Sequence, residues 1–129
     1  MQLALEQPAH LFAVLGERLR LRLACCLVTV KDGLCVCELV DALAEPQPNV
    51  SRHLKLMKAA ALVEERREGR YVYYRLKDAE HSFFDDVRCC LEKVCCCSDI
   101  QDDLQRLRAR LKRRRGGKCV VGFQKKDRR

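Results

Sequence analysis

Residues 35–58, CVCELVDALAEPQPNVSRHLKLMK, constrain the possible fold more than any other part of this chain. The stretch begins with Cys35 and Cys37, two soft thiol ligands separated by one residue. A short helical pattern follows. It must end before Pro46 and Pro48, because proline lacks a backbone N–H and restricts the residue that precedes it. A second helical pattern begins at the prolines, so the sequence predicts two short helices joined by a tight turn.

The second of these helices has one apolar and one polar face. Val50, Leu54 and Met57 recur at helical spacing and are expected to pack inward. A polar, basic outer face on the second helix of such a pair is typical of helix-turn-helix proteins, whose second helix enters the DNA major groove. We therefore predict DNA contacts from this helix, with Asn49, Arg52, His53 and Lys55 facing outward. The full set predicted here is Gln47, Asn49, Ser51, Arg52, His53 and Lys55.

A β-hairpin is expected directly after this helix. Residues 62–67 and 70–76 form two strand-like arms, and Gly69 permits a tight turn between them. Arg67 and Arg70 lie beside that turn, where they favour contact with phosphates or the minor groove over a merely solvated edge. The resulting fold class is mainly α with a β-hairpin wing (α+β), a winged helix-turn-helix.

Helical patterns flank this unit on both sides. Residues 8–15 and 17–29 precede it, and from Asp78 the chain is helical again, with a break expected near Ser98. The last segment carries a long seam of apolar residues at spacings of three and four. A chain of 129 residues has little core in which to bury such a seam, so we expect the seam to form a homodimer interface. Its members are Val87, Leu91, Val94, Cys97, Ile100, Leu104, Leu107 and Leu111.

The net charge of +8 is concentrated at one end of the chain. Residues 112–129 hold nine Lys or Arg against one Asp, which accounts for the whole +8 and leaves residues 1–111 neutral. Within that part, residues 46–77 hold eight basic and three acidic side chains, a local basic patch suited to a DNA module. We expect residues 1–111 to be a DNA-binding and dimerisation domain and residues 112–129 to be a disordered basic tail.

Ten cysteines are many for a chain of this length. The N-terminus lacks the features of an export signal, and no apolar run approaches the length that spans a membrane, so we expect a reducing, cytoplasmic setting and no membrane partner. Some thiols then act as ligands and others as small core residues, with core packing favoured for Cys25, Cys26 and Cys90. No Cys-x-x-Cys motif, nucleotide loop or nucleophile–base set indicates an enzyme.

Three segments in this order resemble the ArsR/SmtB family of metal- and metalloid-responsive repressors. They are LCVCEL (residues 34–39), QPNVSRHL (residues 47–54) and GRYVYYRL (residues 69–76), within a match over roughly residues 8–77. The resemblance implies a repressor that binds double-stranded operator DNA as a homodimer. Arsenite or antimonite would release it by binding cysteine thiolates, without an organic cofactor. Cadmium, lead, zinc or thiol oxidation is the alternative signal, and a thiol-rich metal buffer is a less favoured function.

The sequence departs from that family at one position. Arsenite-responsive members carry a third cysteine three residues after the pair, where this chain has Val40. Residues Cys95, Cys96 and Cys97 are therefore predicted, with Cys35 and Cys37, as metal ligands: they supply either the missing third thiolate or a second, independent site. Cys25, Cys26 and Cys119 are the next candidates for the third ligand.

The spacing of Cys35 and Cys37 leaves two possibilities for binding. Residues two apart on an α-helix point about 200° away from each other, so both thiolates bind one ion only if the first helical turn unwinds. If Cys35 instead precedes the helix, binding requires little movement.

Overall fold

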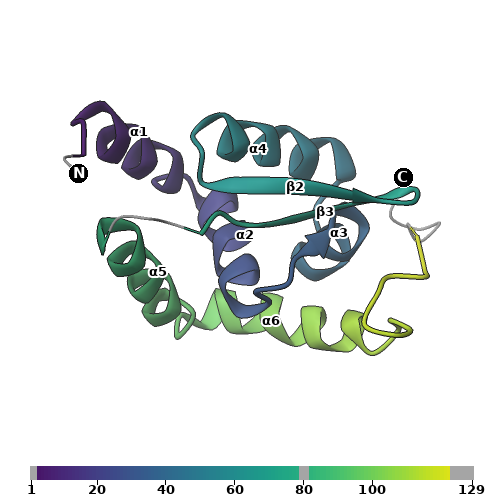
Figure 1. The fold of residues 1–129 in the computed structure, drawn as a ribbon. Helices are drawn as coiled ribbons and strands as arrows, with labels where there is room; N and C mark the ends of the chain where they lie inside the picture. Colours follow the sequence, from purple (N-terminus) through teal and green to yellow (C-terminus); the bar gives the residue numbers. More distant parts are fainter. Residues whose placement is uncertain (1–2, 79–81, 123–129) are drawn as a thin grey trace.

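The computed structural model describes residues 3–78 and 82–122 and has the predicted winged helix-turn-helix architecture (Figure 1). The elements run in the order α1 (Glu6–Leu15), α2 (Arg18–Thr29), β1 (Leu34–Cys35), α3 (Val36–Leu43), α4 (Gln47–Ala59), β2 (Val63–Glu68), β3 (Tyr71–Leu76), α5 (Ser82–Val94) and α6 (Ser98–Leu111). None of the described helices combines the length and the apolar character that crossing a membrane would require.

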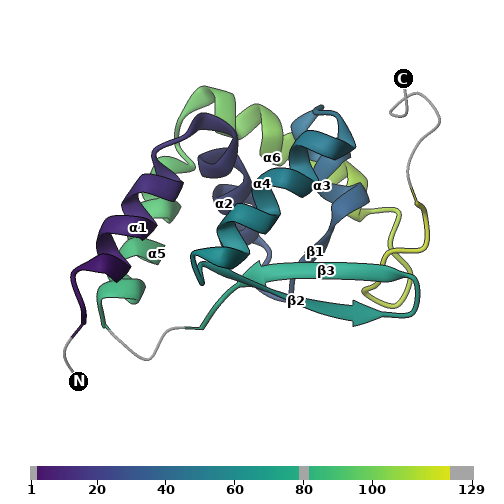
Figure 2. The same cartoon turned by 90° about the horizontal axis from the view of Figure 1, so that it is seen from above.

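The sheet has β3 in the middle, antiparallel to β2 on one side and to β1 on the other (Figure 2). Strands β2 and β3 form the predicted hairpin, and Gly69 takes the positive φ of 60° that its turn requires. The two-residue strand β1 was not predicted. Its pairing places Cys35 opposite Tyr73, so the first cysteine of the pair is fixed to the base of the wing.

Helices α3 and α4 form the helix-turn-helix, and α4 buries one residue more than expected. Val50, Leu54 and Met57 are fully buried, as predicted. His53 is also buried, so the prediction that it faces outward is wrong. It follows Val50 by three residues, which places it on the same face of the helix. Its Nδ1 lies 3.1 Å from an Arg20 guanidinium nitrogen on α2.

Most of the apolar seam of α5 and α6 is buried within one chain, although Cys97 is exposed. Leu91, Ile100, Leu104 and Leu107 are all at most 5% exposed and belong to the main core. The expectation that the seam forms a dimer interface is therefore wrong, because α5 packs on α2 and α6 packs on both α2 and α3. The expected break is present, since α6 begins at Ser98 after α5 has ended at Val94.

Arg22 of α2 fixes the position of α6. Its guanidinium donates two hydrogen bonds of 2.9 Å to the buried carboxylate of Asp103, a planar pairing that sets direction as well as distance. The same guanidinium donates to the carbonyl of Leu43 at the end of α3, at 2.8 Å. These bonds hold α6 alongside α3, with its last turn near the first turn of α3 (Figure 1).

The segment after α6 differs from the expected disordered tail. Helix α6 ends at Leu111, and residues 112–122, the C-terminal strap, fold back onto the domain (Figure 2). Gly116 and Gly117 have positive φ angles of 59° and 75°, which permit the reversal, and Cys119 is only 4% exposed. Buried contacts thus order the strap even though its basic composition suggested disorder. Residues 123–129 lie outside the described part.

Because Leu104 is a core residue, Leu104→Ala should lower the free energy of unfolding by about 2–5 kcal/mol in urea titrations. Leu56 on α4 is 46% exposed, so Leu56→Ala is the matched control and should change stability by less than about 0.5 kcal/mol. Equal stability of the two variants would contradict the intrachain packing of the seam.

Candidate metal centre and nucleic-acid interface

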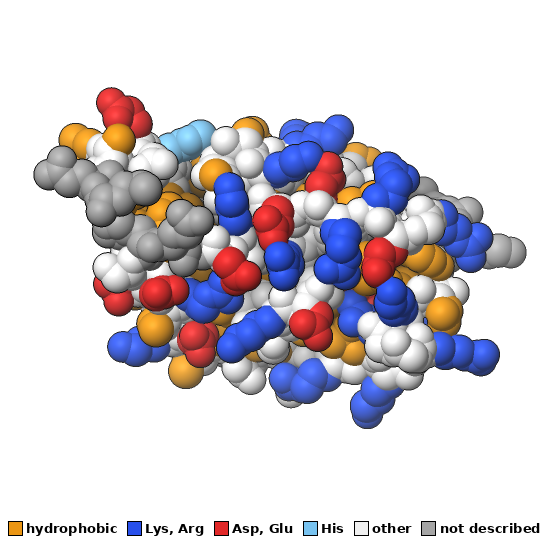
Figure 3. All heavy atoms as spheres, viewed as in Figure 1, with side chains coloured by type: hydrophobic (Ala, Val, Ile, Leu, Met, Phe, Trp, Pro, Cys, Tyr) orange, Lys and Arg blue, Asp and Glu red, His pale blue; other side chains and the backbone are white. Residues whose placement is uncertain are grey.

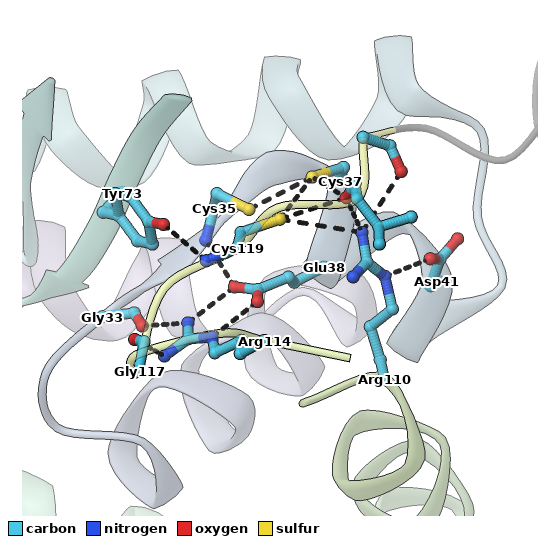
Figure 4. Close-up of polar contacts among 12 residues, drawn as sticks. Gly33, Cys35, Cys37, Glu38, Asp41, Tyr73, Arg110, Arg114, Gly117 and Cys119 are labelled. Atoms are coloured by element: carbon cyan, nitrogen blue, oxygen red, sulfur yellow. Dashed lines mark hydrogen bonds and ion pairs between the residues drawn. The ribbon is translucent and has the colours of Figure 1, made fainter. Parts of the chain in front are cut away.

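Cys35, Cys37 and Cys119 form a compact group of three thiols (Figure 4). Their Sγ atoms all lie within 4.8 Å of one another, with 3.1 Å between Cys35 and Cys37 and 3.6 Å between Cys37 and Cys119. The three side chains are 1–4% exposed. Within residues 3–78 and 82–122, no other group of three or more Cys, His, Asp or Glu side chains comes this close together.

The local backbone explains how Cys35 and Cys37 converge. Cys35 is the N-cap of α3 and has extended dihedral angles (φ −83°, ψ 164°), while Cys37 lies in the first helical turn. Cys35 therefore precedes the helix, and the pairing of β1 with β3 holds it there. Of the two possibilities that the spacing left open, the structure has the one in which binding does not require unwinding.

The fully buried carboxylate of Glu38 forms an ion pair beneath the thiols with Arg114, whose side chain is 13% exposed (Figure 4). Arg114 donates to both carboxylate oxygens of Glu38, at 2.6 and 2.7 Å, and the backbone N–H of Cys35 donates to the same carboxylate at 3.1 Å. Burial raises the pKa of Glu38, but these hydrogen bonds outweigh burial and hold the pKa below its ordinary value. Arg114, itself part of the strap, also donates to the carbonyls of Gly33 and Gly117, so one side chain joins α3, the residue before β1 and the strap.

Two further side chains hold Cys119 in place. The backbone N–H of Cys119 donates to the hydroxyl of Tyr73 at 2.9 Å, which anchors the strap on β3. Arg110 of α6 donates to the carbonyl of Val121 at 2.5 Å and to the carboxylate of Asp41 on α3, also at 2.5 Å. The Arg110 guanidinium lies 3.8 Å from the sulfur of Cys119, so a buried positive charge adjoins the thiols.

Hydrogen bonding separates the acidities of the three thiols. The Cys35 thiol donates to Cys37, which lowers the pKa of Cys37 to about 7; Cys119 and the positive charge of Arg110 add to this effect, and burial opposes it. Donating that hydrogen bond, together with burial, raises the pKa of Cys35, and burial raises that of Cys119. Near neutral pH the group therefore holds one readily formed thiolate, the form that binds soft ions.

The structure does not bring the other predicted ligands to this group. Cys95 lies at the end of α5, where its thiol is 3.9 Å from the carbonyl of Cys25, and Cys96 and Cys97 are exposed in the following turn. Cys25 and Cys26 are fully buried, as expected for core residues, whereas Cys90 is exposed, against expectation. All ten cysteines are free thiols.

Sequence reasoning missed most of what surrounds the thiols. Cys119 was only a reserve candidate, and Tyr73, Arg110 and Arg114 were not identified. For Glu38 a signal existed, since an acid three residues after an N-cap is the spacing of a capping box. For the two arginines no local signal exists, because their acidic partners, Asp41 and Glu38, lie on the distant helix α3.

The predicted DNA-contacting residues are exposed or half-buried, apart from His53. Arg52 and Lys55 on α4 and Arg67 and Arg70 beside the hairpin turn are all exposed. Gln47, Asn49 and Ser51 are half-buried at the start of α4, where the Gln47 amide donates to the Ser51 hydroxyl at 2.6 Å. Figure 3 shows Lys and Arg side chains gathered over α4 and toward the end of the wing. This surface is complementary to a phosphate backbone.

A winged helix-turn-helix with a basic recognition surface is the architecture of a DNA-binding regulator. Comparison with known proteins confirms this class. The profile of the arsR family of bacterial regulatory proteins matches residues 20–65. An uncharacterized HTH-type transcriptional regulator of Methanocaldococcus jannaschii is 36% identical over 73 residues, which cover 57% of this chain and 81% of that protein. This chain belongs to the arsR family of transcriptional repressors and, as predicted, to a class of regulators and not of enzymes.

Relatives with named roles are regulators of resistance to different elements. The arsenical resistance operon repressor of Escherichia coli is 41% identical over 69 residues, covering 54% of this chain and 58% of that repressor. A homolog of the cadmium resistance regulatory protein CadC from Staphylococcus aureus is 34% identical over 82 residues, 61% of this chain and 66% of that protein. Among solved structures, HlyU from Vibrio cholerae superposes with a TM-score of 0.63 at 26% identity, covering 75% of this chain and all of HlyU.

Arg114→Met should lower the free energy of unfolding by about 3–5 kcal/mol, because it leaves the buried carboxylate of Glu38 without a positively charged partner. The double variant Glu38→Gln with Arg114→Met should recover part of that loss in the same urea titrations, since no unpaired charge then remains. A double variant less stable than Arg114→Met alone would contradict this role of the ion pair.

Alkylation of Cys37 by iodoacetamide should reach half its maximal rate near pH 7, because the thiolate is the reactive form and its pKa is about 7. Cys35→Ala removes the thiol that donates to Cys37, so the midpoint should move to higher pH. Peptide mass spectrometry over a pH series measures both profiles. An unchanged midpoint in Cys35→Ala would show that Cys35 is not the cause of the shift.

Proposed function

We propose that this protein is an arsenic-responsive repressor that binds operator DNA as a homodimer in the cytoplasm. It releases the DNA when Cys35, Cys37 and Cys119 bind trivalent arsenic or antimony. The observation that supports this most is the number of ligands: the described residues hold three buried thiols together and no fourth ligand beside them.

The ligand set suits a three-coordinate, thiophilic element. Thiolates prefer soft ions over those that favour oxygen. Structural zinc sites are almost always tetrahedral with four protein ligands, so a set of three thiols matches zinc less well than it matches an element that forms three bonds. Sulfurs bound to one ion at about 2.3 Å lie about 3.8 Å apart at tetrahedral angles. The observed separations of 3.1 and 3.6 Å approach this value, and small side-chain shifts are sufficient.

The binding reaction balances without a redox partner. Arsenous acid, As(OH)₃, and three Cys–SH groups give As(S–Cys)₃ and three water molecules, with three As–O bonds replaced by As–S bonds. The Cys37 thiolate makes the first attack, and Arg110 contributes a buried positive charge next to the reacting sulfurs. The Nη1 of Arg110 is buried without a hydrogen-bond partner among the described residues, so it is free to donate to a departing hydroxyl.

The elements that carry the three thiols support a route from binding to DNA release. Cys37 begins α3, which packs on the recognition helix α4, and Cys35 is paired with β3 of the wing. A ligand shifts an equilibrium only by its difference in affinity between two states. Tying Cys119 to both cysteines with covalent bonds restricts α3, the wing and the strap to one relative arrangement. We propose that this arrangement differs from the one that fits DNA.

An exposed aromatic face supports the homodimer. Phe12 on α1 is 58% exposed, although its ring packs edge to face on Phe83 of α5, 5.6 Å between centroids. Leu5 on the same segment is 79% exposed. Large apolar side chains grouped in this way favour association. A two-fold dimer through this face would present two α4 helices to successive major grooves.

Cys119→Ser should raise the arsenite concentration needed to release operator DNA by at least about tenfold, because one of three As–S bonds is lost. The variant Cys95→Ser/Cys96→Ser/Cys97→Ser is the control, and its response should equal that of the wild type. Fluorescence anisotropy of labelled operator measures release, and X-ray absorption should count three sulfurs around arsenic. A full response in Cys119→Ser, together with its loss in the triple variant, would place the third ligand at Cys95–Cys97. Release by cadmium but not by arsenite would overturn the choice of ion.

Arg52→Ala should weaken operator binding by more than it weakens binding to unrelated duplex DNA, because an exposed arginine on the recognition helix is positioned for a base edge. Lys58→Ala, in the last turn of the same helix, is the matched control for loss of positive charge. Equal losses on both DNAs for Arg52→Ala would assign Arg52 to the phosphate backbone.

A further inference from the structure

An open pocket of about 570 Å³ lies beside the three thiols and has no role in the binding reaction described above. Three segments line it: the start of α3, the start of α4 and the beginning of β3 after the hairpin turn, together with the end of the strap. The lining residues are Cys35, Val36, Cys37, Gln47, Arg70, Tyr71, Val72 and Gly122. Cys35 and Cys37 expose little surface, and both line this pocket.

The position of the pocket between two DNA-reading elements is the key observation. Gln47 begins the recognition helix, and Arg70 lies at the hairpin turn. When α4 enters a major groove and the hairpin reaches the neighbouring minor groove, one phosphate strand must pass between them. The pocket lies between these same two elements, so the strand that separates the two grooves crosses its opening.

The side chains around the opening are suited to bind the phosphates of a DNA strand that lies across it. Arg70 supplies a guanidinium and Gln47 an amide, both of which donate hydrogen bonds to phosphate oxygens. Arg70 stacks over Tyr71, 5.5 Å from guanidinium to ring centroid, which holds its charge at the pocket. Glu68 is the acidic side chain close to the turn, and it is already paired with Lys118 of the strap and with Arg66.

We propose that operator DNA covers the opening through which ligands reach Cys35 and Cys37, so that the thiol pocket is part of the DNA interface. This inference rests on the DNA-binding half of the proposed function and not on the identity of the inducer. The repressor then takes up a thiophilic ligand only while it is off the DNA. Bound operator would therefore limit the access of ligands to the thiols, just as ligand binding to the thiols releases the operator.

Alkylation of the wild-type protein by iodoacetamide tests this directly. Anisotropy first establishes that labelled operator is bound. At free operator about 100-fold above Kd, about 1% of the repressor is unbound, so alkylation of Cys35 and Cys37 should slow by about 100-fold. Peptide mass spectrometry follows each cysteine separately. If the operator is saturated and Cys35 and Cys37 react at less than about a twofold lower rate, the inference is overturned.

Two cysteines of the same chain serve as internal controls. Cys96 is exposed in the turn between α5 and α6 and should react equally fast with and without DNA. Cys26 is buried in the core and does not line the pocket, so it reports protection that arises because DNA stabilises the whole domain. If Cys26 is protected as strongly as Cys35 and Cys37, DNA acts by stabilisation and not by covering the pocket, and the inference fails.

The kinetics of DNA release provide a second test. With increasing arsenite, the rate of release in stopped-flow anisotropy should level off at the rate of spontaneous dissociation, measured separately with excess unlabelled operator. A release rate that continues to rise beyond that limit would show that arsenite reaches the thiols of the DNA-bound repressor, contrary to the proposal. Absence of any arsenite effect would overturn the choice of inducer and leave the alkylation result to decide on the pocket.

Discussion

The buried ion pair between Glu38 and Arg114 is the interaction on which the thiol site depends. Replacing a buried ion pair by apolar side chains is often neutral for stability. The importance of this pair therefore lies less in the stability it adds than in the segments that it holds together. The Glu38 carboxylate accepts the backbone N–H of Cys35 at the start of α3, and the Arg114 guanidinium joins that carboxylate to the strap and to Gly33. Together with the contact between Cys37 and Cys119, the pair holds the segment that carries Cys119 against the start of α3.

The three thiols come from three different structural elements, and two of these elements lead to the parts of the protein that we expect to contact DNA. Cys35 belongs to the sheet, Cys37 to α3 and Cys119 to the strap, so any bond among them connects three elements. Two of these elements lead directly to DNA-reading parts, since β1 pairs with the wing and α3 packs on α4. A site built on one helix would lack these connections. The pocket beside the cysteines is open to the surface, and Gln47 of α4 and Arg70 of the hairpin turn line it together with Cys35 and Cys37.

Three differences between expectation and structure have one physical origin. Helical periodicity identified the apolar residues of α6 but not their partner, and Leu104 and Leu107 pack on their own chain. The same limitation affected His53, which shares a face with Val50 and meets Arg20 from α2. Composition suggested that residues after Leu111 remain disordered, yet Arg114 and Cys119 find buried partners on distant segments. In each case the contact that decides the outcome is distant in sequence.

The sequence by itself determined the local structure. Apolar spacing, Pro46 and Pro48, and Gly69 were sufficient to predict the helix-turn-helix and the hairpin, and the one-residue spacing of Cys35 and Cys37 indicated two ligands, because these signals act over a few residues. Only the tertiary structure decided that Cys119, 82 residues from Cys37, completes the thiol group. That outcome depends on the direction of α6 across α3, which the Arg22–Asp103 pair fixes, and on the reversal of the strap after it. No short-range pattern encodes the angle between two helices, so no pattern within the strap could identify Cys119 as the third thiol.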